Sequence, residues 1–117
     1  MLPLILAVSA TVAPLKYPLP ACSVKAAEVA RTKQDLPPSV RLAVADFADS
    51  KEAFNKTDAL PPNMEGLPFK RLICGYPTAT GYVVEWEQGG RGYSIRRTAF
   101  RKASAGYELD PAPGRHL

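Results

Sequence analysis

The feature that most constrains the fold of this chain is the stretch of residues 82–97, whose pattern is that of a β-hairpin with a glycine-rich tip. Apolar and polar residues alternate on both sides of the tip, which is the period of half-buried strands. Gly89 and Gly90 readily adopt the positive φ angles that a tight hairpin turn needs. The sequence therefore predicts antiparallel sheet, with two strands meeting at residues 89–92.

The alternation also predicts how this hairpin pairs. With a loop of two residues or of four, Trp86 lies opposite Tyr93 or Ile95, and the apolar residues of both strands share one face. A loop of three residues would place them on opposite faces, and we expect it not to form. The shared apolar face, which we expect to pack under a helix, holds Tyr82, Val84, Trp86, Tyr93 and Ile95. The other face, which we expect to be solvated, holds Glu85, Glu87, Ser94, Arg96 and Thr98.

The rest of the chain predicts helices first and strands afterwards. Residues 23–34 favour a weak helix with an alanine face, and Val40, Val44 and Phe47 predict a better one over residues 38–48, with an extension to residue 54. Residues 55–68 have the composition of a connector. The strand candidates are residues 69–76, 82–87, 93–102 and 105–109. We therefore expect an α+β fold, with one or two N-terminal helices packed on a three- to four-stranded antiparallel β-meander.

The N-terminal residues point to export. Residues 2–13 form an uncharged, mostly apolar run that matches the hydrophobic region of a signal peptide and is too short to span a bilayer. No Lys or Arg precedes it, so an upstream start and a buried segment of a cytosolic fold both stay open. We assign residues 1–21 to a leader and Pro-rich connector, 22–110 to a single domain and 111–117 to a flexible tail. The expected location is periplasmic or secreted, or cytoplasmic if the leader assignment is wrong.

The two cysteines, Cys22 and Cys74, allow three interpretations. A disulfide between them would close a long loop and stabilise the fold by about 3–4 kcal/mol. Residues 19–22 are also similar to a lipoprotein processing box, which would place a lipid anchor on Cys22. Two buried free thiols are the third interpretation.

Residues suited to catalysis or metal binding are sparse. The one histidine, His116, lies in the predicted tail, where it is a poor general base or metal ligand. A zinc site would need a second histidine or a clustered cysteine pair. Glu85 and Glu87 share a strand face, as paired catalytic carboxylates do, but a solvated face explains them more simply. We predict no enzyme, no catalytic residue, no metal and no cofactor.

Binding is the more promising function. The formal charge of +4 favours anionic partners. Backbone amides at the hairpin tip can form an anion-binding concavity, and an arginine there can clamp a phosphate or carboxylate. The candidate binding residues are Gly89, Gly90, Arg91, Gly92, Arg96 and Arg97. We do not expect nucleic-acid binding, because a domain-wide basic stripe is missing.

The N-terminal apolar run, the Leu36, Pro37, Pro38 triplet and the glycine-rich residues 87–93 together resemble small uncharacterised exported proteins of Gram-negative bacteria. The resemblance covers residues 36–109 and implies an exported protein of the same fold, without catalytic residues. We predict a small non-enzymatic monomer that binds an envelope component or another protein. One alternative is a secreted enzyme inhibitor that inserts residues 89–92 into a cleft, and another is a cytosolic nucleic-acid-binding module that uses the basic strands.

Overall fold

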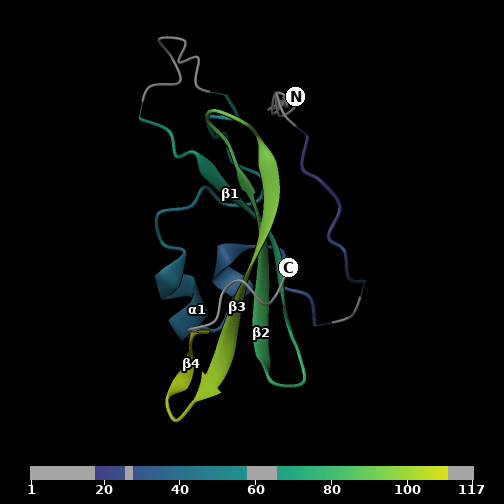
Figure 1. Cartoon of the computed structure of the whole chain (residues 1–117), viewed down its shortest axis with the longest axis vertical. Helices are drawn as coiled ribbons and strands as arrows, with labels where there is room; N and C mark the ends of the chain where they lie inside the picture. The colour runs from purple at the N-terminus through teal and green to yellow at the C-terminus, as the bar shows by residue number, and fades with distance from the viewer. Residues whose placement is uncertain (1–17, 26–27, 58–65, 111–117) are drawn as a thin grey trace, which may run out of the picture.

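The computed structural model describes residues 18–25, 28–57 and 66–110. The described residues form a four-stranded antiparallel sheet with the strand order β1-β2-β3-β4 (Figure 1). Its strands are β1 (Lys70–Pro77), β2 (Gly81–Gln88), β3 (Ser94–Ala103) and β4 (Gly106–Leu109). The predicted meander is therefore confirmed, with strand ends within two residues of those expected. Of the leader and connector expected over residues 1–21, residues 1–17 lie outside the described residues, as does the expected tail at 111–117.

The predicted fold class is wrong, because the described part of the chain is mostly β. It contains one short helix, α1 (Pro38–Ala43), and a 3-10 turn, η1 (Lys33–Asp35). The helix expected over residues 38–48 stops early, since Ala48 pairs with β1 instead: its N–H donates to the Lys70 carbonyl (2.8 Å) and its carbonyl accepts from Leu72 (2.9 Å). Once the backbone of residue 48 is bonded to a strand, the helix cannot continue through it.

The weak helix expected over residues 23–34 is also replaced by contact with β1. Ala30 and Gly75 exchange two backbone hydrogen bonds, of 2.7 and 2.9 Å, in an antiparallel bridge. An alanine face offers little apolar area to bury in a helix. Bonding to the edge of β1 satisfies the backbone there and places Ala30 in the core.

The predicted hairpin register is wrong as well. The loop between β2 and β3 has five residues, 89–93, so Gln88 pairs with Ser94 and Trp86 pairs with Arg96. We expected loops with an odd number of residues not to form, because they place the apolar residues of the two strands on opposite faces. This loop does so, and Ile95 lies on the face opposite to that of Trp86. Ile95 is 54% exposed and Tyr93 lies in the loop, so neither belongs to the core.

The two faces of the sheet are consequently unlike each other. The face towards α1, here called the helix face, packs apolar side chains of the sheet against Val40, Val44 and Phe47. Its central strand residues are Leu72, Tyr82, Val84 and Phe100. The opposite face, here called the covered face, lies under residues 18–25, which run down the right of the sheet in Figure 1. Trp86 is half-buried against the helix-face core, as predicted, with its ring 5.1 Å from that of Phe47.

An irregularity in the pairing of β1 with β2 changes which side chains of β1 point to each face of the sheet. Leu72 pairs with Trp86 and Cys74 pairs with Glu85, which leaves Ile73 as an extra residue, a β-bulge. Ile73 and Cys74 both belong to the apolar cluster beneath residues 18–25. The bulge thus places two consecutive buried side chains of β1 on the covered face.

No helix in the described residues combines the length and the apolar character needed to cross a membrane.

Candidate binding surface

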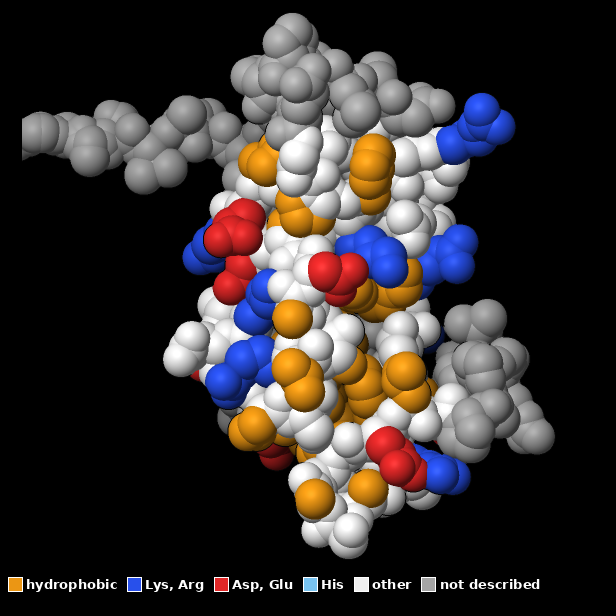
Figure 2. All heavy atoms as spheres, turned by 90° about the vertical axis from the view of Figure 1, so that its left-hand side faces the viewer, with side chains coloured by type: hydrophobic (Ala, Val, Ile, Leu, Met, Phe, Trp, Pro, Cys, Tyr) orange, Lys and Arg blue, Asp and Glu red, His pale blue; other side chains and the backbone are white. Residues whose placement is uncertain are grey.

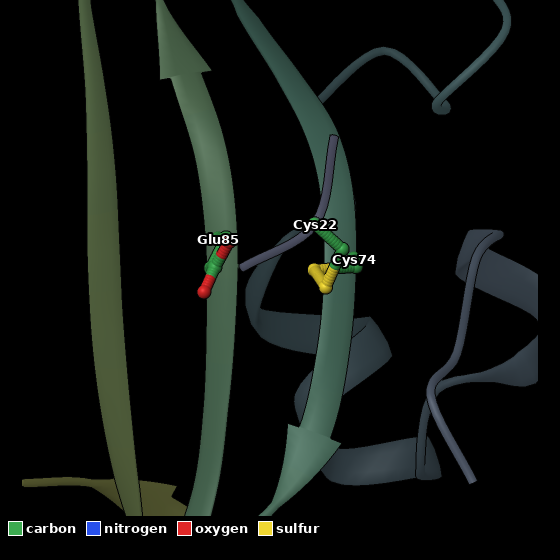
Figure 3. Close-up of side chains that lie close together, drawn as sticks. All are labelled: Cys22, Cys74 and Glu85. Carbon is green, nitrogen blue, oxygen red and sulfur yellow. A yellow bond between two sulfur atoms is a disulfide. The ribbon is translucent and has the colours of Figure 1, made fainter. Parts of the chain in front are cut away.

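A disulfide fixes residues 18–25 to the covered face. Cys22 and Cys74 are bonded to each other, with their Cα atoms 5.9 Å apart (Figure 3). The bond joins a segment outside the sheet to the middle of β1, across a sequence separation of 52 residues. It uses both sulfur atoms, so the structure favours the disulfide over the free thiols and over a lipid on Cys22.

The carboxylate of Glu85, on β2 beside the disulfide, is buried and bonded on both oxygens. The Ser23 amide donates to Oε1 (3.1 Å), while the hydroxyl groups of Ser23 and Tyr76 donate to Oε2, the latter at 2.6 Å. Arg97 of β3 forms an ion pair with the same carboxylate at 3.4 Å. Burial alone would raise the pKa of Glu85, but these hydrogen bonds and the Arg97 charge outweigh it and hold the pKa below its ordinary 4.5.

Glu87 forms a second buried site two residues further along β2. Its Oε2 accepts from Arg71 Nε at 2.6 Å, and both side chains are only 1% exposed. The Tyr93 hydroxyl donates to Oε1 at 2.7 Å. Burial, together with this hydrogen bond to a carboxylate, raises the pKa of Tyr93 to about 12. Arg71 also lies over the Phe54 ring, at 4.5 Å.

The expectation of a solvated face around Glu85 and Glu87 is therefore wrong. Three of their partners, Ser23, Tyr76 and Arg71, come from elements outside the hairpin, and the hairpin sequence alone contains no sign of these three. The strand pairings reveal two partners, because β1 places Arg71 directly opposite Glu87 and β3 places Arg97 directly opposite Glu85.

The Glu85 carboxylate is held in its charged form, and the Glu87 carboxylate is held by Arg71 and Tyr93. A catalytic acid needs a raised pKa and an accessible proton, whereas Glu85 has a lowered pKa and donors on both oxygens. Cys22, Cys74 and Glu85 place their ligand atoms within 4.8 Å of one another (Figure 3). Metals bind cysteine as the thiolate, and sulfur atoms in a disulfide carry no such charge. The covered face is thus a structural site in its oxidised form.

The glycine-rich tip is held against the rest of the domain. The amide of Gly89 donates to the Phe69 carbonyl (2.6 Å) and that of Gly90 donates to the Lys56 carbonyl (3.0 Å). A Cβ at Gly89 would lie 2.0 Å from the Asn55 carbonyl oxygen, so only glycine permits this approach. The two amides proposed for an anion concavity are therefore occupied by carbonyls of the chain itself.

The basic side chains of the candidate set lie beyond this anchored base. Gly92 adopts a φ of 77° and, like Arg91, is exposed at the tip. Arg96 and Arg97 follow on β3, and both are exposed. Since Arg96 pairs with Trp86 and Arg97 pairs with Glu85, the two guanidinium groups leave opposite faces of the sheet.

A groove of about 730 Å³ runs along this part of β3. Its lining residues come from β2, from β3 and from the disulfide-linked segment: Ala21, Ser23, Glu85, Trp86, Ser94, Ile95, Arg96, Arg97 and Thr98. Arg97 keeps 48% of its side chain exposed despite its ion pair. The groove therefore combines two arginines with the exposed apolar side chain of Ile95.

The side of the molecule that carries α1 has a different surface. Figure 2 shows apolar side chains gathered over its lower half, with basic and acidic groups around them. In contrast, the ten residues of β3 include Arg96, Arg97, Arg101 and Lys102 and no acidic residue. An anionic partner would meet charges of both signs on the α1 side. Along β3 it would meet the positive excess that remains after Arg97 pairs with Glu85 and Arg101 pairs with Glu108.

No protein-family model, no curated protein and no solved structure matches this chain.

Proposed function

We propose that this chain is a non-enzymatic exported protein that binds an anionic partner on the surface of β3. The observation that carries the proposal is the groove that Arg96, Arg97 and the exposed Ile95 line together. Arginine side chains bind carboxylate and phosphate groups in bidentate fashion, and they act with an apolar neighbour in many interfaces.

Export is proposed from two observations of different kinds. The apolar run at residues 2–13 has the length of a signal-peptide core. The buried disulfide suits an oxidising compartment such as the periplasm or the extracellular space. Mass spectrometry of the protein recovered from cell fractions tests this, with the expectation of a shortened N-terminus and of cysteines that are two hydrogens lighter than the thiols. Recovery of the full chain with Met1 and free thiols from the cytosol would contradict export.

The binding proposal is tested by titrating the oxidised protein with anionic probes, namely a Glu-rich synthetic peptide and vesicles that contain phosphatidylglycerol. The double variant Arg96→Ala/Arg97→Ala should lower the affinity for the bound probe about tenfold, since each exposed ion pair contributes up to about 1 kcal/mol. The matched control is Arg31→Ala/Lys51→Ala, which removes the same charge from exposed positions outside β3. Equal losses in both variants, or no binding of any probe by the unaltered protein, would contradict the proposal.

An enzyme inhibitor is the second candidate. It is supported by the anchored base of the hairpin tip, because a loop held at Gly89 and Gly90 presents the exposed Arg91 with little freedom. A trypsin-like peptidase is the test enzyme, since its specificity pocket accepts arginine. Inhibition that Arg91→Ala abolishes and that Arg96→Ala leaves unchanged would favour this candidate over the first.

A further inference from the structure

Within the described residues, one edge of β3 has no partner strand over most of its length. Residues 100–103 pair with β4, but the described residues contain no strand on the outer side of residues 94–99. The outer edge of a strand presents unpaired N–H and C=O groups, which are a template for another extended chain.

The hydrogen bonds at the ends of this edge identify the groups that face outwards. Asp110 donates its amide to the Ala99 carbonyl (3.1 Å), so the backbone groups of Ala99 point away from β2. Because this direction alternates along an antiparallel strand, the N–H and C=O of Ile95 and Arg97 also point outwards. Lys102, which has the opposite parity, donates on the β2 side to the Thr80 carbonyl (3.3 Å), in agreement with this assignment.

The charges beside the edge select the kind of chain that can add to it. Natural sheet edges often carry basic residues, which repel a second copy of the same strand. Here Arg96 projects on one face and Arg97 on the other, so a strand placed alongside meets a cation on each face. The exposed side chain of Ile95, which lines the groove, adds apolar area for contact. These features match an acidic segment, whose carboxylates on either face reach an arginine.

We propose that the outer edge of residues 94–99 binds an extended acidic segment of a partner protein, which adds to the sheet as a further strand next to β3. This inference rests on the proposed anionic partner and specifies both its class and its mode of binding. The backbone groups of Ile95 and Arg97 supply the main-chain hydrogen bonds, and Arg96 and Arg97 supply the charge selection.

A proline at position 95 isolates the main-chain part of this interaction. Ile95→Pro removes an N–H that points outwards and leaves the bonds between β3 and β2 in place, which is the setting in which strands accept proline. The probe is a capped synthetic peptide with the repeat Val-Glu-Glu. Ile95→Pro should weaken binding about tenfold or more through the lost hydrogen bond and the displaced strand. The control Ile95→Ala removes the side chain, keeps the N–H and should weaken binding about threefold or less.

A second measurement does not depend on the folding of the proline variant. The same peptide with an N-methyl group on every backbone amide cannot donate to β3 from either of its edges, and it should bind the unaltered protein at least about tenfold more weakly than the plain peptide.

The outcomes separate the added strand from the anionic partner. Equal binding of plain and methylated peptides, with no effect of Ile95→Pro, would show attraction by charge alone and overturn the added strand, while the anionic-partner proposal stands. Preference for phosphatidylglycerol vesicles with no peptide binding has the same meaning. A dimer that Ile95→Pro dissociates would assign the edge to a second copy and also overturn the added strand. Failure of every anionic probe would overturn both proposals.

Discussion

The two faces of the sheet are both buried at their centres, yet by different chemistry. The helix face is closed by apolar side chains such as Leu72, Val84 and Phe100, which any neighbour of suitable volume can cover. The covered face buries Glu85 and Glu87, and each of these carboxylates needs donors at defined positions. The comparison shows that one sheet can carry a tolerant core on one side and an exacting polar core on the other. Substitutions on the two faces should therefore differ in how much they lower the free energy of unfolding and in how that loss depends on pH. They should also differ in which segment loses its protection from hydrogen exchange.

The largest difference should come from the buried ion pair. Arg71→Met leaves the Glu87 carboxylate buried without its main partner, and we expect the free energy of unfolding to fall by about 3–5 kcal/mol. Urea denaturation at neutral pH measures this loss. The double variant Arg71→Met/Glu87→Leu removes both charges and should recover most of it. A loss of less than about 1 kcal/mol in the single variant would show that the covered face does not depend on the Arg71–Glu87 pair.

The disulfide should have an effect of similar size that is confined to one face. Replacing Cys22 and Cys74 by serine opens a loop with a sequence separation of 52 residues. On the chain-entropy account this lowers the free energy of unfolding by about 4 kcal/mol. Hydrogen exchange should rise first in residues 18–25, and protection around Val40 and Leu72 should persist as long as the domain stays folded. Uniform loss of protection over both faces would contradict the separation drawn between them.

The helix face should respond through volume alone. Leu72→Ala removes a fully buried side chain beneath α1 and should lower the free energy of unfolding by about 3 kcal/mol through the cavity that it leaves. Because no charge changes, the loss should be the same at neutral pH and below pH 4.5, the ordinary pKa of a glutamate carboxyl. Chemical denaturation at both pH values provides the check. A loss that shrinks at acidic pH would link this face to carboxylate titration and weaken the contrast.

The smallest effect, and the most dependent on pH, should come from Tyr76→Phe. The variant removes a hydrogen bond to Glu85 and should lower the free energy of unfolding by about 1.5 kcal/mol at neutral pH. Since the folded-state pKa of Glu85 lies below 4.5, its stabilisation is present above that pH and is lost as the pH falls through the folded-state value. The difference between variant and parent should therefore shrink in acid. Tyr82→Phe, on the helix face, is the control and should show no such change; a constant difference for Tyr76→Phe would count against the assignment.

The strands were predictable from sequence because their signals are local. Alternation and turn residues lie within each hairpin, and they place β1 to β4 to within two residues. The end of α1 was not predictable in this way, because it depends on Ala48 bonding to β1, more than twenty residues further along the chain. The prediction of the hairpin register was wrong for a related reason, because it took the face of Glu85 and Glu87 to be the solvated one. Glu85 and Glu87 look like surface residues until Ser23 and Arg71 are known to reach them.

The basic side chains of the candidate site could be predicted from the sequence, whereas the hydrogen bonding of its backbone could not. Arg96 and Arg97 are exposed beside a groove, as the basic pair in the sequence suggested, although Arg97 also forms an ion pair with Glu85. The amides of Gly89 and Gly90 are bonded to the carbonyls of Phe69 and Lys56, which no pattern within the tip could indicate. The open edge of β3 follows from the shortness of β4, which pairs with only four residues of its neighbour.

The five-residue loop at residues 89–93 limits how this protein can vary in sequence. Inserting or deleting a single residue there would shift β3 by one residue relative to β2, so that every side chain of β3 changes face. Phe100 would leave the helix face, and Arg96 would turn towards the buried carboxylates. Inserting or deleting two residues keeps the number of loop residues odd, so the side chains of β3 stay on their faces and only the length of the tip changes. Natural relatives with this architecture should therefore carry loops of odd length at this point, whatever the amino acids within them.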